Sequence, residues 1–217
     1  MINKKLIVTS LILMQLSHLK AATDLPIDTL GSNDMTKPLI MYITGDGGFN
    51  NFSTAFMKEW NNNGYPVVAL NAKSYFWKTK TPEVATEDVS GLITQYLSLW
   101  KRNEVILVGY SFGADVMPFI QARLKQGILN KLLHTVLLSP SKNTDFTIHL
   151  FYNNDGNNVP SEINKLNKPV LVIFGNEETD LPDKQINNKQ VTIIKIEGDH
   201  RYNNKISNIV HNILSRL

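Results

Sequence analysis

One stretch of sequence decides the fold: residues 104–114, which read Glu-Val-Ile-Leu-Val-Gly-Tyr-Ser-Phe-Gly-Ala. Its apolar part, Val105–Val108, has the composition of a strand that is buried on both faces. A helical pattern follows directly, so Ser111 lies on the turn between a strand and a helix. A turn this sharp requires small flanking residues, which Gly109 and Gly113 provide. The stretch therefore predicts a strand-to-helix turn that presents the Ser111 hydroxyl.

Apolar runs and helical patterns alternate on both sides of this turn. The expected strands are Leu39–Thr44, Pro66–Asn71, Glu104–Tyr110, Leu133–Ser139, Pro169–Gly175 and Val191–Glu197. The expected helices are Phe52–Asn63, Pro82–Lys101, Ala114–Gln126 and Asn203–Leu217. This alternation predicts a mostly parallel sheet of about six strands with helices on both faces. Together with the strand-to-helix turn at Ser111, it indicates the α/β-hydrolase-like class.

Three segments lie outside this rhythm. Residues 1–22 resemble a cleaved secretory signal, because two lysines precede the apolar run Leu6–Leu16 and two alanines end the segment. A retained N-terminal anchor is the other reading. Residues 23–37 form a polar lead-in, and residues 38–217 are expected to be one domain. Within it, 142–165 is either an extra hairpin or a cap over the site, and Asp145–Tyr152 alternates like a short edge strand.

Composition narrows the classes of function. Lys4, Lys5 and Lys20 account for three of the 22 basic residues, so the chain without its signal has 19 basic and 19 acidic residues. A near-neutral chain of this kind argues against a nucleic-acid-binding surface. The absence of cysteine excludes disulfides and thiolate chemistry. No spacing of metal ligands is present, so neither a metal nor another cofactor is expected.

A serine hydroxyl needs a base to accept its proton, and His200 is the expected base. It follows the last predicted strand and precedes the last helix, and in this fold the order along the chain is serine, acid, histidine. His18 lies in the signal, His134 begins a strand and His211 lies within a helix. His149, in the irregular insert, is the only serious rival.

The acid that orients the histidine is expected in the loop after Gly175, which contains three acidic residues. Asp180 is the first choice. Glu178 is the alternative, because many relatives of this fold place the acid three residues after such a glycine. Either carboxylate could hold the imidazole and stabilise its protonated form.

Backbone N–H groups near Ser111 should form an oxyanion hole. One donor is expected to be Phe112, directly after the nucleophile. The second is expected from the glycine-rich loop after the first strand, at Asp46 or Gly47. That loop lacks the Gly-Lys-Ser/Thr of a P-loop, which makes a nucleotide site improbable.

Four residues are candidates for contacts with substrate. Asp115 is either a favourable charge near the start of its helix or, together with Asp46, part of a negative field that attracts a cation. Tyr75 and Trp77 follow the second strand run, on the sheet edge that carries active sites in such folds. They are expected in an apolar wall near the site, although a plain core position is the other reading.

The chain also resembles the bacterial virulence protein VirJ/AcvB family over roughly residues 37–214. The motifs that carry the resemblance are Tyr42–Gly48, Gly64–Val68, Ser74–Trp77 with Thr81–Glu83, Val108–Val116 and Asp145–His149. The family's acidic loop is interrupted here by Asn176 and Thr179, and its paired histidines appear as His200-Arg201. The resemblance implies a periplasmic α/β-hydrolase. AcvB-type members hydrolyse lysyl-phosphatidylglycerol, and VirJ-type members are linked to type IV secretion and virulence.

These observations predict an exported serine esterase that cleaves an ester bond, with the lysyl ester of lysyl-phosphatidylglycerol as the substrate that the resemblance implies. A general carboxylesterase or thioesterase is the alternative within enzymes. A non-catalytic adaptor that binds secretion-system proteins is the alternative from another class. The expected partners are a lipid or small-molecule ester, the membrane surface and secretion-system proteins, without nucleic acid.

Overall fold

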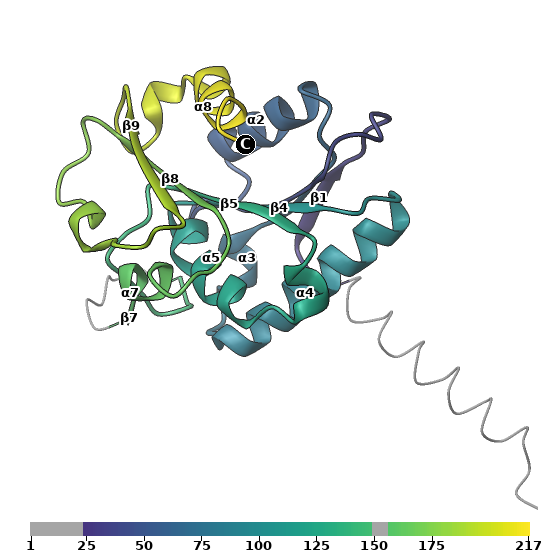
Figure 1. Ribbon diagram of the computed structural model, residues 1–217, viewed down its shortest axis with the longest axis horizontal. Coiled ribbons are helices and arrows are strands. Elements are labelled where there is room, and N and C mark those ends of the chain that lie inside the picture. Colours follow the sequence, from purple (N-terminus) through teal and green to yellow (C-terminus); the bar gives the residue numbers. More distant parts are fainter. Residues whose placement is uncertain (1–23, 149–155) are drawn as a thin grey trace, which may run out of the picture.

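Seven strands form the central sheet of the computed structural model, which describes residues 24–148 and 156–217 (Figure 1). Their order across the sheet is β1-β3-β2-β4-β5-β8-β9. The strands are β1 (Ile27–Leu30), β2 (Leu39–Ile43), β3 (Val67–Leu70), β4 (Val105–Tyr110), β5 (Leu132–Leu138), β8 (Val170–Gly175) and β9 (Val191–Ile196). β1 pairs antiparallel with β3, and the other neighbours in the sheet pair in parallel. All the loops that follow the parallel strands therefore leave from one edge.

Helices cover both faces of this sheet (Figure 1). One face carries α2 (Asn51–Asn62) and α8 (Ile206–Leu214). Their apolar side chains, among them Phe56 and Trp60 of α2, belong to one core cluster. The helices that contribute to the cluster on the other face are α3 (Ala72–Tyr75), α4 (Pro82–Leu99), α5 (Phe112–Arg123), α6 (Gln126–Leu129) and α7 (Val159–Ile163). Two short 3-10 helices, η2 (Asp183–Gln185) and η3 (Tyr202–Asn204), lie on either side of β9 in the sequence. Every residue of the central strands β2, β3 and β4 is buried, as expected where helices cover both faces.

Local capping sets the starts of the long helices. The Asn50 side chain accepts a hydrogen bond from the Ser53 amide and begins α2. The Thr81 hydroxyl does the same for the Val84 amide at the start of α4, where Pro82 occupies the first helical turn. In both helices the cap satisfies an amide that has no partner within the helix.

The predicted class of fold and all six predicted strands are confirmed, with ends that differ by at most one residue. The sheet has one strand more than expected, because Ile27–Leu30 in the supposed lead-in forms β1. This strand has four residues, pairs on one side only and is only partly buried. An edge strand of this kind lacks the continuous apolar run by which the central strands were found.

The insert contains a small two-stranded ribbon. β6 (Asn143–Thr144) pairs antiparallel with β7 (Asn157–Asn158), and α7 follows. The predicted edge strand Asp145–Tyr152 is wrong over its described part, because Phe146 has a φ of 56° and is 1% exposed, which turns the chain into the core. Residues 149–155, and with them His149, lie outside the described residues, as does the predicted signal at 1–22.

The β4–α5 turn is packed so closely that two of its positions have no room for a side chain. A Cβ atom on Gly113 would lie 2.2 Å from the carbonyl oxygen of Ile43, at the end of β2. A Cβ atom on Gly109 would lie 2.4 Å from the carbonyl oxygen of Gly113. The glycines thus allow the helix to start directly against the neighbouring strand.

Gly113→Ala is expected to lower the free energy of unfolding by about 1–3 kcal/mol, since the methyl group would overlap backbone that cannot move away cheaply. Gly91→Ala is the matched control. Gly91 lies inside α4, and apart from its chain neighbours and the backbone of its own helix nothing lies within 4 Å of its added methyl, so this change should stabilise by about 0.5–1 kcal/mol. Urea unfolding of both variants measures the difference. Equal effects of the two changes would contradict the close packing of the turn.

Candidate active site

Ser111 lies at the carboxyl end of β4 and directly before α5, with a φ of 51° and a ψ of −119°. A non-glycine residue in this region is strained, and such strain is held in place by surrounding structure and is frequent at functional sites. The amide of Ser111 donates to the carbonyl of Leu138 at the end of β5. Its side chain makes a further contact, with an imidazole from the opposite end of the sequence.

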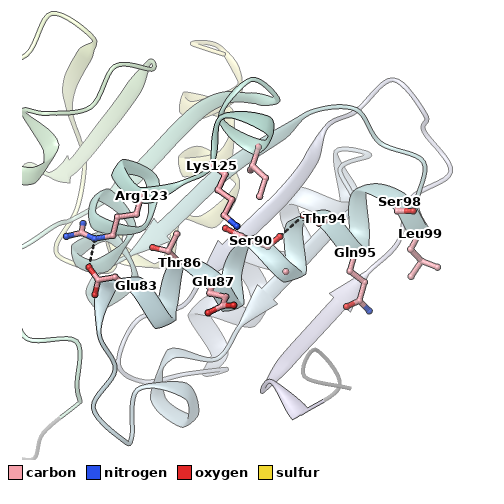
Figure 2. Close-up of a pocket in the computed structure, with 12 residues that line it drawn as sticks. Glu83, Thr86, Glu87, Ser90, Thr94, Gln95, Ser98, Leu99, Arg123 and Lys125 are labelled. Carbon is pink, nitrogen blue, oxygen red and sulfur yellow. Dashed lines mark hydrogen bonds and ion pairs between the residues drawn. The ribbon is translucent and has the colours of Figure 1, made fainter. Parts of the chain in front are cut away.

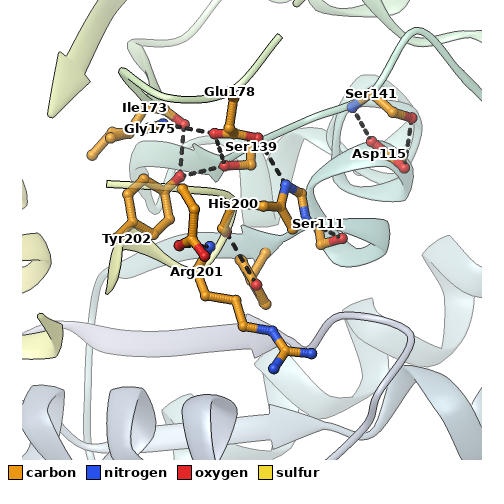
Figure 3. Close-up of polar contacts among 12 residues, drawn as sticks. Ser111, Asp115, Ser139, Ser141, Ile173, Gly175, Glu178, His200, Arg201 and Tyr202 are labelled. Carbon is orange, nitrogen blue, oxygen red and sulfur yellow. Dashed lines mark hydrogen bonds and ion pairs between the residues drawn. The ribbon is translucent and has the colours of Figure 1, made fainter. Parts of the chain in front are cut away.

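His200 supplies that imidazole from the loop after β9. Its Nε2 lies 2.9 Å from Ser111 Oγ, across 89 positions of sequence (Figure 3). The Tyr110 hydroxyl donates to the His200 carbonyl at 3.2 Å, and the two rings lie 5.6 Å apart. The predicted base and nucleophile therefore lie within hydrogen-bonding distance, as general-base catalysis requires.

Glu178 completes the chain of contacts. Its Oε2 lies 2.8 Å from His200 Nδ1, while Oε1 accepts hydrogen bonds from Ser139 Oγ at 2.7 Å and the Gly175 amide at 2.6 Å (Figure 3). Its side chain is 10% exposed. A carboxylate in this place fixes the orientation of the imidazole and directs Nε2 at Ser111.

The carboxylate in contact with His200 is that of Glu178, the predicted alternative, and not that of Asp180, the first choice of acid. Asp180 forms an ion pair with Lys142, and its side chain is 82% exposed. A tight turn explains the difference, because the Glu178 amide donates to the Gly175 carbonyl and brings Glu178 back to the end of β8. Asp180 lies two residues further along, beyond this turn.

The pKa values of His200 and Glu178 are shifted in the directions that favour a charged imidazolium beside a charged carboxylate. The hydrogen bond to Glu178 raises the pKa of His200 above its usual value, against the opposing effect of burial. Burial pushes the pKa of Glu178 upward, but hydrogen bonds from His200, Ser139 and the Gly175 amide outweigh it and leave that pKa lowered. The imidazolium that forms when His200 accepts a proton is therefore stabilised in place.

Two backbone segments beside Ser111 are the candidates for the oxyanion hole. Phe112 is the first residue of α5, where backbone N–H groups have no partner within the helix. The loop after β2 lies beside the nucleophile, because a Cβ on Gly45 would be 3.4 Å from Ser111 Cβ. Asp46 and Gly47 lie exposed in the turn that the Gly48 amide closes on the Gly45 carbonyl. The choice of Asp46 or Gly47 as second donor stays a prediction.

The four candidate substrate residues separate into two groups. Asp115 is 6% exposed, and both of its carboxylate oxygens accept hydrogen bonds from Ser141, at 2.6 Å from the amide and 2.9 Å from the hydroxyl. Tyr75 is 5% exposed and its hydroxyl donates to Asp88, so it is a core residue and not part of a wall of the site. Asp46 and Trp77 are exposed, Trp77 by 61%.

Burial changes what Asp115 can do. It raises the pKa of Asp115 to about 7, although the Ser141 hydrogen bonds oppose that shift. The carboxyl group holds the loop after β5 and does not face solvent. A direct contact between Asp115 and a substrate cation, as predicted, does not fit this arrangement. Its influence on the site is electrostatic, since its charge also acts to raise the pKa of His200.

Ser139 and Tyr202 belong to the site but were not identified from the sequence. Ser139 directly follows β5, and its hydroxyl contacts both Glu178 and the Tyr202 hydroxyl. A polar residue at the carboxyl end of a parallel strand was the available signal for Ser139. Tyr202 is fully buried and gave no signal, because an aromatic residue near a helix start is typical of core.

A cavity of about 400 Å³ opens beside the triad. Its lining residues are Ser139, Pro140, Ser141, Lys142, Asn143, Glu178, Thr179, Asp180, Leu181, Pro182 and His200. A larger cavity, of about 1000 Å³, lies over α4 and the α5–α6 turn and is lined by residues such as Glu83, Ser90, Leu99 and Arg123 (Figure 2). Because no triad residue lines the larger cavity, the smaller one is the candidate substrate site.

The helices formed by the described residues all lack the length or the apolar character that a membrane span requires. The same described residues contain no group of three or more His, Asp or Glu side chains that could hold a metal ion.

Solved structures share this fold. Est1E from Butyrivibrio proteoclasticus, solved with ferulic acid bound, has a TM-score of 0.64 and 16% identity, covering 88% of this chain and 93% of its own. A putative dienelactone hydrolase from Klebsiella pneumoniae has a TM-score of 0.61 and 13% identity, covering 88% of this chain and 91% of its own. A putative α/β hydrolase from Agrobacterium tumefaciens has a TM-score of 0.62 and 16% identity, covering 88% of this chain and 89% of its own. A comparison with curated proteins gave no match.

The sheet order, the turn at Ser111 and the contacts to His200 and Glu178 define a protein of the α/β-hydrolase class. The family model described as "Bacterial virulence protein (VirJ)" matches residues 37–217. The chain therefore belongs to the VirJ family.

Glu178→Gln is expected to lower the pKa of His200, because a neutral amide stabilises the imidazolium less than a carboxylate does. Asp180→Asn is the matched control and should leave that pKa unchanged, since Asp180 is exposed and paired with Lys142. NMR titration of the His200 ring measures both. A lowered pKa in the Asp180 variant alone would restore Asp180 as the acid.

Proposed function

We propose that this protein is a serine hydrolase of ester bonds. The observation that carries the proposal is the continuous contact of Ser111 Oγ, the His200 imidazole and the Glu178 carboxylate, at 2.9 and 2.8 Å. Among the hydrogen bonds of the described residues, no other joins a serine hydroxyl to a histidine ring. A hydroxyl, a base and an orienting acid in this order are the groups that acyl transfer requires.

The reaction proceeds in two halves. His200 Nε2 accepts the Ser111 proton while Ser111 Oγ attacks the ester carbonyl, and the negative charge on the carbonyl oxygen develops near the Phe112 amide. The imidazolium, held by Glu178, then gives its proton to the departing alcohol and an acyl-serine remains. A water molecule, deprotonated by His200, attacks the acyl-serine, and the proton returns to Ser111 as the acid is released.

We further propose that the ester is the lysyl ester of lysyl-phosphatidylglycerol and that the protein is exported to the periplasm. The resemblance to the AcvB-type members of this family supports the substrate, as does the charge around the site. Asp46 and Asp115 both act electrostatically on His200, which favours a cationic acyl group. Exposed Trp77 follows Phe76, whose ring lies 5.0 Å from that of Phe112, so it offers apolar surface near the site for a lipid.

A general carboxylesterase or thioesterase is the second candidate. Its support is the fold, which the chain shares with solved esterases and with a thioesterase domain from the curacin biosynthetic pathway. A purely adaptor role in type IV secretion would not require the contacts among Ser111, His200 and Glu178. The two enzymatic candidates differ in whether a cationic acyl group is preferred.

Ser111→Ala is expected to abolish lysyl-phosphatidylglycerol hydrolysis, with a loss on the order of 10⁶-fold in kcat, because no other group can form the acyl-enzyme. A fluorophosphonate probe should label the unaltered protein and not this variant. Ser98→Ala, on the exposed side of α4, is the control and should keep full activity. Lipid turnover that survives in the Ser111 variant would contradict the proposed nucleophile.

Asp46→Asn is expected to raise KM for a lysyl ester about two- to fivefold, the strength of an exposed ion pair, and to leave KM for a neutral acetyl ester unchanged. Asp28→Asn, on the exposed edge strand, is the control for loss of an acidic charge elsewhere. Steady-state kinetics with both esters measure the ratio. An equal effect on both esters would favour the general carboxylesterase.

A further inference from the structure

A second layer of hydroxyl groups lies behind the catalytic acid. Ser139 Oγ contacts Glu178 Oε1 and the Tyr202 hydroxyl, each at 2.7 Å, and the Tyr202 hydroxyl donates to the Ile173 carbonyl at 2.9 Å (Figure 3). The Ile173 carbonyl also accepts the Ser139 amide at 2.8 Å. The ends of β5 and β8 and the loop after β9 therefore meet at one pair of hydroxyls.

The hydrogens available fix the direction of these contacts. Ser139 and Tyr202 each carry one hydroxyl hydrogen, and together they make three contacts with polar atoms. When Ser139 donates to the ionised Glu178, the single hydroxyl hydrogen of Tyr202 is the only one left for the other two contacts, so it is shared between Ser139 Oγ and the Ile173 carbonyl. Tyr202 thus holds the Ser139 oxygen in the orientation in which its hydrogen points at the carboxylate.

Both residues are buried and both are held in an unfavourable backbone conformation. Ser139 is 3% exposed with a φ of 50°, and Tyr202 is fully buried with a φ of 54°. Asn203 and Asn204 continue in the left-handed region, with φ values of 51° and 55°. Three successive non-glycine residues in this region are strained, and packing elsewhere must retain them.

The strained turn begins at Tyr202, two residues after His200, which links the loop that carries the base to the same pair of hydroxyls. A Cβ on Gly198 would lie 2.6 Å from Tyr202 Cα, so the two sides of the His200 loop are in backbone contact. The Tyr202 ring fills the core beneath that loop, and its hydroxyl is tied to β8. Tyr202 therefore contacts Ser139, which holds the acid Glu178. It also fixes the loop that carries the base His200.

We infer that Ser139 and Tyr202 are positioning residues, whose paired hydroxyls lock Glu178 and the His200 loop into the geometry that activates Ser111. This inference rests on the proposed function for its effect on catalysis, but not for its effect on His200 itself. Neither residue touches the reacting atoms.

Tyr202→Phe removes only the hydroxyl and keeps the ring in the core, and Ser139→Ala removes the other member of the pair. Both variants should lower the pKa of His200, measured by NMR titration, since a less ordered Glu178 stabilises the imidazolium less. Tyr42→Phe is the matched control, because Tyr42 is also buried and its hydroxyl contacts a serine, Ser53, at 3.2 Å. It should leave the His200 pKa unchanged.

Hydrolysis of p-nitrophenyl acetate gives a second readout. In the Tyr202 and Ser139 variants we expect kcat to fall roughly ten- to a hundredfold with KM little changed, and the acidic limb of the pH profile to move to lower pH. The double variant should lose little more than either single one, because the hydroxyls act as one unit. Additive losses, or a pH profile that does not move, would overturn the inference.

The two proposals fail in different ways. If the unaltered protein neither hydrolyses esters nor reacts with a fluorophosphonate, the proposed function is lost, while the NMR titration still tests the positioning pair. If the protein is active and the His200 pKa is the same in Tyr202→Phe, Ser139→Ala and Tyr42→Phe, the positioning role is wrong. Should Tyr202→Phe not fold, as judged by its thermal unfolding, the Ser139→Ala titration decides alone.

Discussion

The close approach of the β4–α5 turn to the end of β2 is the constraint on which the site depends. Gly113 lies so near the Ile43 carbonyl that α5 must begin at once, and Ser111 is forced to the tip of the turn with a positive φ. Because the strands are parallel, the loops after β2, β5, β8 and β9 leave from the same edge. Each of them therefore brings its residues toward this one hydroxyl.

Two carboxyl groups near His200, the partly buried Glu178 and the buried Asp115, show how hydrogen-bond partners and burial set the pKa of an acid. Glu178 accepts hydrogen bonds from Ser139 and the Gly175 amide and faces the imidazole, and its pKa is lowered in spite of burial. Asp115 has Ser141 as its hydrogen-bonding partner, and burial raises its pKa to about 7. One carboxyl group is suited to stabilise an imidazolium, and the other holds a loop.

Elements that the sequence did not reveal share a physical cause. β1 is a four-residue edge strand with partial burial, and β6 and β7 are two residues each, so none carries a long apolar run. Tyr75 follows a strand as Trp77 does, yet it turns inward to Asp88 while Trp77 stays exposed. Local pattern gives the period of a segment, whereas burial depends on what packs against it.

The sequence by itself determined the alternation of strands and helices, the turn at Ser111 and the place of His200 after the last strand. These follow from apolar period, glycine spacing and chain order, which are local properties. Only the tertiary structure decided which of Glu178 and Asp180 contacts His200. It also decided that Asp115 is buried against Ser141 and that Ser139 contacts Tyr202. These contacts join residues 22 to 63 positions apart, and whether such residues meet is set by how the sheet and its loops pack.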